Sequence, residues 1–62
     1  MYRYRVSFTD EVHGVTTEDF FTFEEAAEYW QDYADTPTCI RGWLMDLDNN
    51  EIIWQFGEEA DK

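Results

Sequence analysis

The fold is decided by residues 22–34, which read TFEEAAEYWQDYA. Thr22 and Glu25 have the spacing of a capping box, in which each side chain accepts a hydrogen bond from the other residue's amide. Apolar residues then recur at intervals of three and four, as on one face of a helix. Pro37 disfavours helical geometry just before it, so a helix of about thirteen residues should end near Asp35. The predicted apolar face consists of Phe23, Ala26, Ala27, Trp30 and Ala34, flanked by Tyr29 and Tyr33.

The segments on either side of this helix have the pattern of strands. Residues 2–9 alternate between apolar and polar side chains, which is typical of a strand with one buried face. Gly14 favours a turn, and residues 15–21 return as a second strand. Residues 39–47 and 51–56 form a second pair. The sequence therefore predicts an α+β fold of order β-β-α-β-β, a four-stranded, mainly antiparallel sheet with one helix packed on one face.

The chain length allows one domain with one core. We expect residues 1–57 to form a single compact domain and residues 58–62 to form a frayed acidic tail. Cys39 is the only cysteine, so an intrachain disulfide is impossible, and no apolar stretch has the length of a signal peptide or a membrane helix. These features predict a cytoplasmic protein without membrane association.

The register of the first hairpin depends on its turn. A two-residue loop at residues 13–14 places Val6 opposite Phe21. A longer loop places Phe8 opposite Phe20 and turns the other set of side chains inward. The sequence leaves both registers open.

The second hairpin is predicted to close with a two-residue turn at residues 49–50, because asparagine tolerates left-handed geometry. This turn pairs Met45 with Trp54 and Trp43 with Phe56 on one face of the sheet, next to a Leu47–Ile52 pair. One short helix can cover only one face of a sheet, so an apolar face is left over. We expect that face to dock a partner or to form a homodimer through Trp43, Met45, Trp54 and Phe56.

The charge of the chain is strongly one-sided. Fifteen acidic and four basic residues give a formal net charge of -11. Such a surface repels phosphates, so direct binding of nucleic acid or of an anionic membrane is disfavoured, and a basic protein is the expected partner. The alternative interpretation is that the acidity is a background property of the source lineage.

The acidic residues of the predicted helix form a row. Their spacings of four, four and three place them on one side, where successive helical turns rise by about 5.4 Å. This spacing is comparable in scale with that of phosphates along one nucleic-acid strand, although a merely solvated helix face has the same pattern. The predicted acidic binding surface consists of Glu24, Glu28, Asp32 and Asp35, with Glu25 alongside and with Glu18 and Asp19 from the second strand.

No pattern in the sequence indicates catalysis. His13 is the only histidine and lies in a predicted turn, and Cys39 is expected to be a small, buried apolar residue. Residues 46–50 resemble the start of a calcium loop, but Glu51 replaces the glycine of position six and Gly57 replaces the glutamate of position twelve. We therefore predict a non-enzymatic protein with no catalytic residue, metal or cofactor.

In size, charge and one-domain plan, the chain resembles the small acidic inhibitors made by phages and mobile elements, including anti-CRISPR proteins and other DNA mimics. The resemblance covers composition and plan, without a shared motif. It implies that a carboxylate array occupies the basic channel in which an enzyme or effector complex holds nucleic acid. The competing hypothesis is a small homodimeric or docking module that uses the apolar sheet face.

Overall fold

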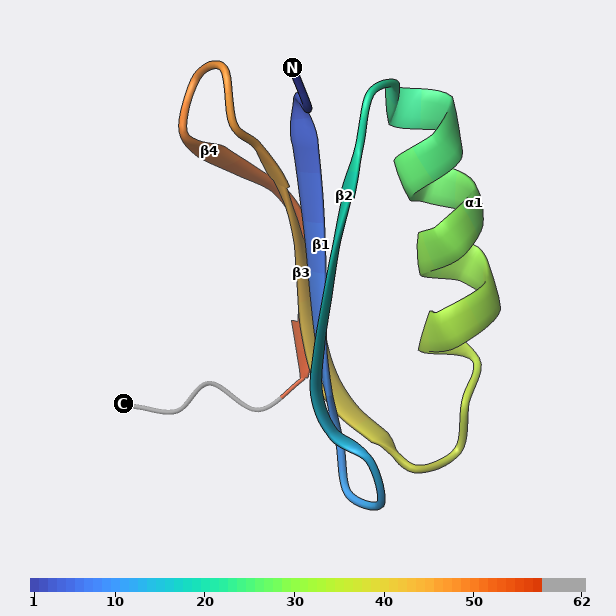
Figure 1. Ribbon diagram of the computed structural model, residues 1–62. Coiled ribbons are helices and arrows are strands. Elements are labelled where there is room, and N and C mark those ends of the chain that lie inside the picture. Colours follow the sequence, from blue (N-terminus) through green and yellow to red (C-terminus); the bar gives the residue numbers. More distant parts are fainter. Residues whose placement is uncertain (58–62) are drawn as a thin grey trace.

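The computed structural model describes residues 1–57, and the predicted tail at residues 58–62 lies outside the described residues. Within residues 1–57, four antiparallel strands form one open sheet and one helix covers one of its faces (Figure 1). This confirms the predicted α+β fold and its β-β-α-β-β order. The elements are β1 (Tyr4–Asp10), β2 (Gly14–Phe20), α1 (Phe23–Ala34), β3 (Cys39–Asp46) and β4 (Glu51–Gly57).

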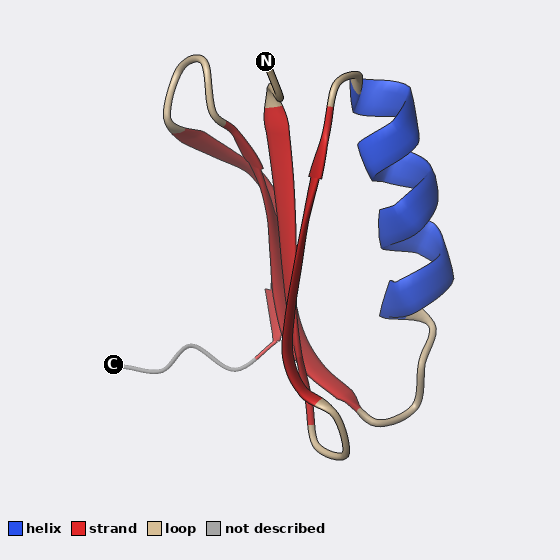
Figure 2. Cartoon of the chain, viewed as in Figure 1, coloured by secondary structure: helices blue, strands red, loops and turns tan. Residues whose placement is uncertain are grey.

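The strand order in the sheet is β2-β1-β3-β4, so that β1 and β3 are central and β2 and β4 are edges. Figure 2 shows α1 lying along one side of the sheet, with no other described element over the opposite side. The structure therefore has two layers, and one sheet face lacks a covering layer in the described part of the chain. We call this uncovered side the open face.

The capping box is present at the start of α1. The Glu25 amide donates to Thr22 Oγ1 at 3.2 Å, and the Thr22 amide donates to Glu25 Oε1 at 3.4 Å. Asp35 caps the other end, so that the helix comprises 12 residues and ends where the sequence predicts. The predicted apolar side of the helix packs on the sheet, since Ala26 is fully buried and Tyr29, Trp30, Tyr33 and Ala34 contact the core.

Phe8 lies at the centre of a small aromatic core. Its ring stacks on Tyr33 of α1, with 4.8 Å between the centroids and 11° between the planes, and lies 5.2 Å from the ring of Trp30. On the sheet, Phe8 is paired with Gly42 of β3. A Cβ atom at residue 42 would lie 2.6 Å from Phe8 Cε1, so only glycine leaves room for this ring. The fully buried apolar residues of the described chain are Val6, Phe8, Ala26 and Leu44.

Both predicted registers of the first hairpin are wrong. Tyr4 pairs with Phe20, and Phe8 pairs with Thr16. The loop is longer than two residues, as in the second alternative, but it covers residues 11–13. The reason is the Asp10 carboxylate, which accepts hydrogen bonds from two loop amides and so starts the turn early, while Gly14 closes it with a φ of +82°.

The predicted register of the second hairpin is also wrong. Its loop begins at Leu47, because the Asp46 carboxylate accepts from the Asp48 amide at 3.0 Å and from the Asn49 side chain at 3.3 Å. Asn50 adopts the expected left-handed geometry, with a φ of 57°. A register shift also falls between Leu44 and Met45.

This change of register separates the four predicted apolar anchors. Trp54 pairs with Leu44 and, like Phe56, faces the helix, where both rings contact Trp30 at centroid distances of 5.7 and 5.5 Å. Trp43 pairs with Gln55 on the open face, and Met45 lies on the same side. The anchors therefore do not form one surface.

Replacing Gly42 with alanine should destabilise the fold, because the added methyl group displaces the Phe8 ring from the core. We expect a loss of about 1–3 kcal/mol in the free energy of unfolding, the usual effect of overpacking. Urea denaturation followed by tryptophan fluorescence measures it. Gln55→Ala, at an exposed position of the neighbouring strand, is the control and should stay within about 0.5 kcal/mol of wild type. Equal effects of the two changes would contradict this packing.

Candidate protein-binding surface

The outer side of α1 is a continuous acidic surface. Three carboxylates of α1 and that of its C-cap residue, which together we call the acidic row, are exposed, and α1 contains no lysine or arginine. Glu25 lies beside the row, but its carboxylate also accepts the capping hydrogen bond from Thr22. Since the opposite side of the helix is fixed on the sheet by aromatic contacts, the row points away from the sheet. The acidic row consists of Glu24, Glu28, Asp32 and Asp35.

The two acidic residues predicted from β2 lie on opposite faces of the sheet. Glu18 pairs with Val6 on the helix side, and its charge acts on Tyr29. Burial raises the pKa of the Tyr29 phenol, and the nearby Glu18 carboxylate raises it further. Glu18 therefore extends the acidic surface from α1 onto the sheet edge.

Asp19 contributes little free charge to this surface. It points to the open face, where Arg5 Nε and Nη2 donate to its two oxygens at 2.7 and 3.2 Å. The hydrogen bond from Arg5 holds the pKa of Asp19 below its usual value. Because the two charges neutralise each other, Asp19 is a poor contact for a basic partner.

A groove that the sequence reasoning missed runs beside the acidic row. It has a volume of about 580 Å³ and lies between the end of β2 and the helix. Tyr2 and Phe21 stack in it with 4.6 Å between their centroids, and Phe21 is 56% exposed. The signal was the consecutive pair Phe20-Phe21, because only one of two neighbouring residues at the end of a strand can face the core, and Phe20 does so here. The acidic residues that line the groove are Asp19, Glu25, Glu28 and Asp32.

The open face has a different chemical character. Successive strands place Asp19, Arg5 and Met45 in one row across the sheet, and Thr17, Ser7 and Trp43 in the next. Thr17 Oγ1 donates to Ser7 Oγ at 3.3 Å. Trp43 and Met45, both half-buried, therefore lie among small polar groups and a neutralised ion pair. This face is less apolar than predicted.

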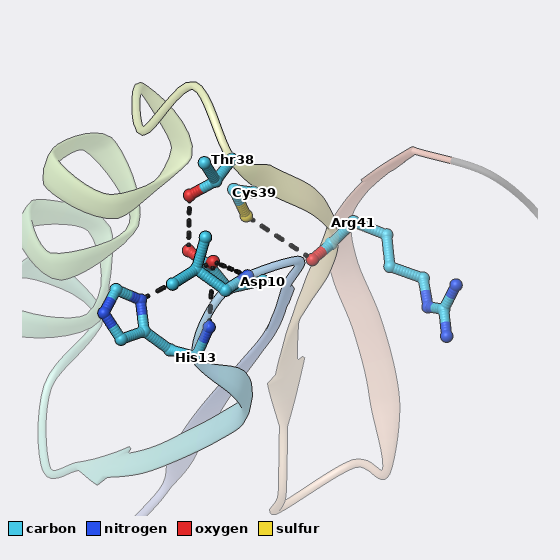
Figure 3. A network of polar contacts seen from close by, with 6 residues as sticks. Asp10, His13, Thr38, Cys39 and Arg41 are labelled. Carbon is cyan, nitrogen blue, oxygen red and sulfur yellow. Dashed lines mark hydrogen bonds and ion pairs between the residues drawn. The ribbon is translucent and has the colours of Figure 1, made fainter.

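Asp10 organises a polar network at the end of the sheet where the first hairpin loop lies (Figure 3). Its carboxylate is almost fully buried, with 2% exposure, and accepts from the Val12 amide at 2.8 Å, the His13 amide at 3.2 Å and Thr38 Oγ1 at 3.0 Å. The Val12 hydrogen bond is the largest influence on the pKa of Asp10 and lowers it, against the opposing effect of burial. This network ties the first hairpin loop to the segment that follows α1.

The network places a cysteine, a histidine and an aspartate near one another, but not as a catalytic set. Cys39 Sγ donates to the Arg41 carbonyl at 3.7 Å and not to the imidazole. Burial and the Asp10 charge raise the pKa of the Cys39 thiol, which disfavours the thiolate. His13 is bound to Asp10 through Nδ1 at 3.5 Å. The geometry is that of a structural link between loops.

The segment that resembles a calcium loop is a hairpin turn. The Asp46 carboxylate is occupied by the turn itself and by Arg3 Nε at 3.4 Å. Burial alone would raise the pKa of Asp46, but the hydrogen bonds of Arg3 and Asp48 lower it below its usual value. Residues 1–57 contain no group of three or more side chains placed to hold a metal ion.

Comparison with protein-family models, with curated proteins and with solved structures gave no match. In the described part of the chain, no helix has the length and apolarity needed to cross a membrane.

Removing the charge of Asp10 should weaken the fold in a pH-dependent way. Because the pKa of Asp10 is lower in the folded state, its stabilising effect is complete above about pH 4 and is lost as the pH falls through the folded-state value. Asp10→Asn should therefore be less stable than wild type near pH 7, and the difference should narrow under acid conditions. Thermal unfolding monitored by circular dichroism from neutral to acid pH measures this.

Asp32→Asn is the matched control, since it removes the same charge from an exposed helix position. It should change the unfolding free energy by less than about 0.5 kcal/mol. A difference between Asp10→Asn and wild type that is the same at all pH values would contradict the role given to the Asp10 carboxylate.

Proposed function

We propose that this chain is a non-enzymatic, cytosolic protein that binds a basic surface of a nucleic-acid-binding protein or effector complex and inhibits it. The observation that carries the proposal is the exposed acidic row on a helix without basic residues, in a chain of net charge -11. The mechanism is that of a DNA mimic, as in the anti-CRISPR class of phage inhibitors. Carboxylates take the place that phosphates occupy in the partner's basic channel.

The placement of the acidic row favours binding over mere solubility. A net charge of about 2 to 8 in magnitude is enough to keep a small domain soluble. The net charge of this chain, -11, exceeds that range. Like charges at helical spacing also destabilise a helix by a few tenths of a kcal/mol per pair. A basic partner removes this repulsion when it binds, so the cost to the free protein strengthens the complex.

The groove beside the row adds a reason to expect arginine in the partner. An arginine side chain can pair with a carboxylate and at the same time stack its planar group on an aromatic ring. Glu28 and Asp32 line the same groove as the rings of Phe21 and Tyr2. Arginine-rich surfaces are those with which proteins hold phosphates, which supports a nucleic-acid-binding partner.

The remaining polar groups support a binding role and not a catalytic one. Asp10 and Asp46 are engaged in loop hydrogen bonds, and Asp19 is neutralised by Arg5. The thiol of Cys39 has a raised pKa and a backbone partner. Within residues 1–57, the largest group of exposed carboxylates lies on the outer side of α1.

Reversing three charges of the acidic row should abolish capture of the partner. In Glu24→Lys/Glu28→Lys/Asp32→Lys, each substitution changes the charge by two units, so that the net charge changes from -11 to about -5. Immobilised wild-type protein should capture a nucleic-acid-binding protein from bacterial lysate at low salt, and DNA or high salt should release it. The triple variant should retain less than about a tenth of the captured protein.

The matched control is Glu11→Lys/Asp48→Lys/Glu51→Lys, which makes the same change of net charge at exposed residues outside α1. This variant should keep most of the capture. Equal loss in both variants would mean that net charge alone is responsible, and capture that resists both salt and DNA would overturn the proposal.

A further inference from the structure

We propose that the open face is the interface of a homodimer, in which it packs against the same face of a second copy of the chain. This proposal is independent of the inhibitor function, because it uses the side of the sheet opposite to α1. Its central residues are Trp43 and Met45, with Arg5, Asp19, Arg41 and Gln55 around them.

The charge distribution selects a second copy as the partner. In a twofold dimer the same patch meets itself, so a patch of one charge sign would repel its own copy. The charged strand residues of the open face are Arg5, Asp19 and Arg41, two positive and one negative, in a chain of net charge -11. Among its described strand residues the open face thus has no excess of negative charge to attract a basic protein, and it is the side on which two copies can meet.

The layering keeps the acidic surfaces of the two copies far apart. Stacked sheets lie about 10 Å from each other, and a helix layer on each outer side brings the separation of the two helices to roughly 30 Å. The Debye length in physiological salt is about 8 Å, so the two acidic rows are screened from each other. The dimer would also leave both acidic rows exposed for binding.

The apolar area that a dimer would bury comes from a few residues at the centre of the face. Trp43 lies between Ser7 and Gln55 in its cross-strand row, and Met45 lies next to Ile52, which is 45% exposed. The core on the other side of the sheet is small, with four fully buried apolar residues in the described chain. A second sheet over Trp43 would add the apolar burial that a chain of this size lacks.

The area of the face indicates a weak, reversible dimer. Four strands about 4.8 Å apart, with seven or eight residues each rising about 3.3 Å, give a footprint of roughly 19 by 23 Å, or about 440 Å² per copy. The two copies together would bury about 870 Å² of such footprint, which is below the range of about 1,200–2,000 Å² of stable specific interfaces and in the range of transient ones. We therefore expect the dimer to form at micromolar to near-millimolar concentration.

Sedimentation equilibrium of the full chain tests the proposal across that concentration range in physiological salt. The average mass should rise from that of one chain towards that of two, and no further. Gln55→Glu places a negative charge beside Trp43 at an exposed position that the fold tolerates, and it should weaken the dimer by about tenfold.

Gln31→Glu is the matched control, because it makes the same chemical change on the exposed side of α1. It should leave the dimerisation constant unchanged. The proposal is overturned if wild type stays monomeric near millimolar concentration, if mass continues to rise beyond two chains, or if both variants weaken association equally. Failure here leaves capture of a basic protein by the acidic row unaffected, so the two proposals can be separated.

Discussion

The structure depends on the packing of Phe8 between a glycine and a helix. The ring occupies the space above Gly42 that any other residue would fill, and Tyr33 and Trp30 of α1 close over it. This contact fixes which side of the sheet the helix covers. Once the helix is fixed, Trp54 and Phe56 of β4 complete the same cluster. Trp43 of β3 is left on the open face.

The same constraint gives the molecule two chemically different sides. Because the apolar stripe of α1 faces Phe8, its carboxylates must face solvent, and they form a surface without basic residues. On the open face, Arg5 neutralises Asp19, and small polar groups surround Trp43. One helix placed on one face thus separates a charged surface, which we propose for a basic partner, from a nearly neutral surface, which we propose for a second copy.

The sequence predicted the helix, the strands and the acidic row, because these depend on short, periodic patterns. Thr22 and Glu25 identified the helix start, and acidic residues at helical spacing identified its outer side. The hairpin registers were not predictable from apolar alternation. Asp10 and Asp46 set the loop lengths through side-chain hydrogen bonds to backbone amides, and the wrong loop length reassigned Trp54 and Phe56 to the opposite face. The separation of Glu18 from Asp19, in contrast, followed from strand alternation alone.

We propose that the outer side of α1, with its acidic row, is the surface that binds a basic partner. Titration of the isotopically labelled chain with an arginine-rich peptide, followed by amide chemical shifts at low protein concentration, tests it most directly. If the acidic row binds the peptide, shifts concentrate at Glu24, Glu28 and Asp32, extend to Glu18 and disappear at high salt. Shifts centred on Ser7 and Trp43 of the open face, or spread evenly over all exposed carboxylates, would contradict it.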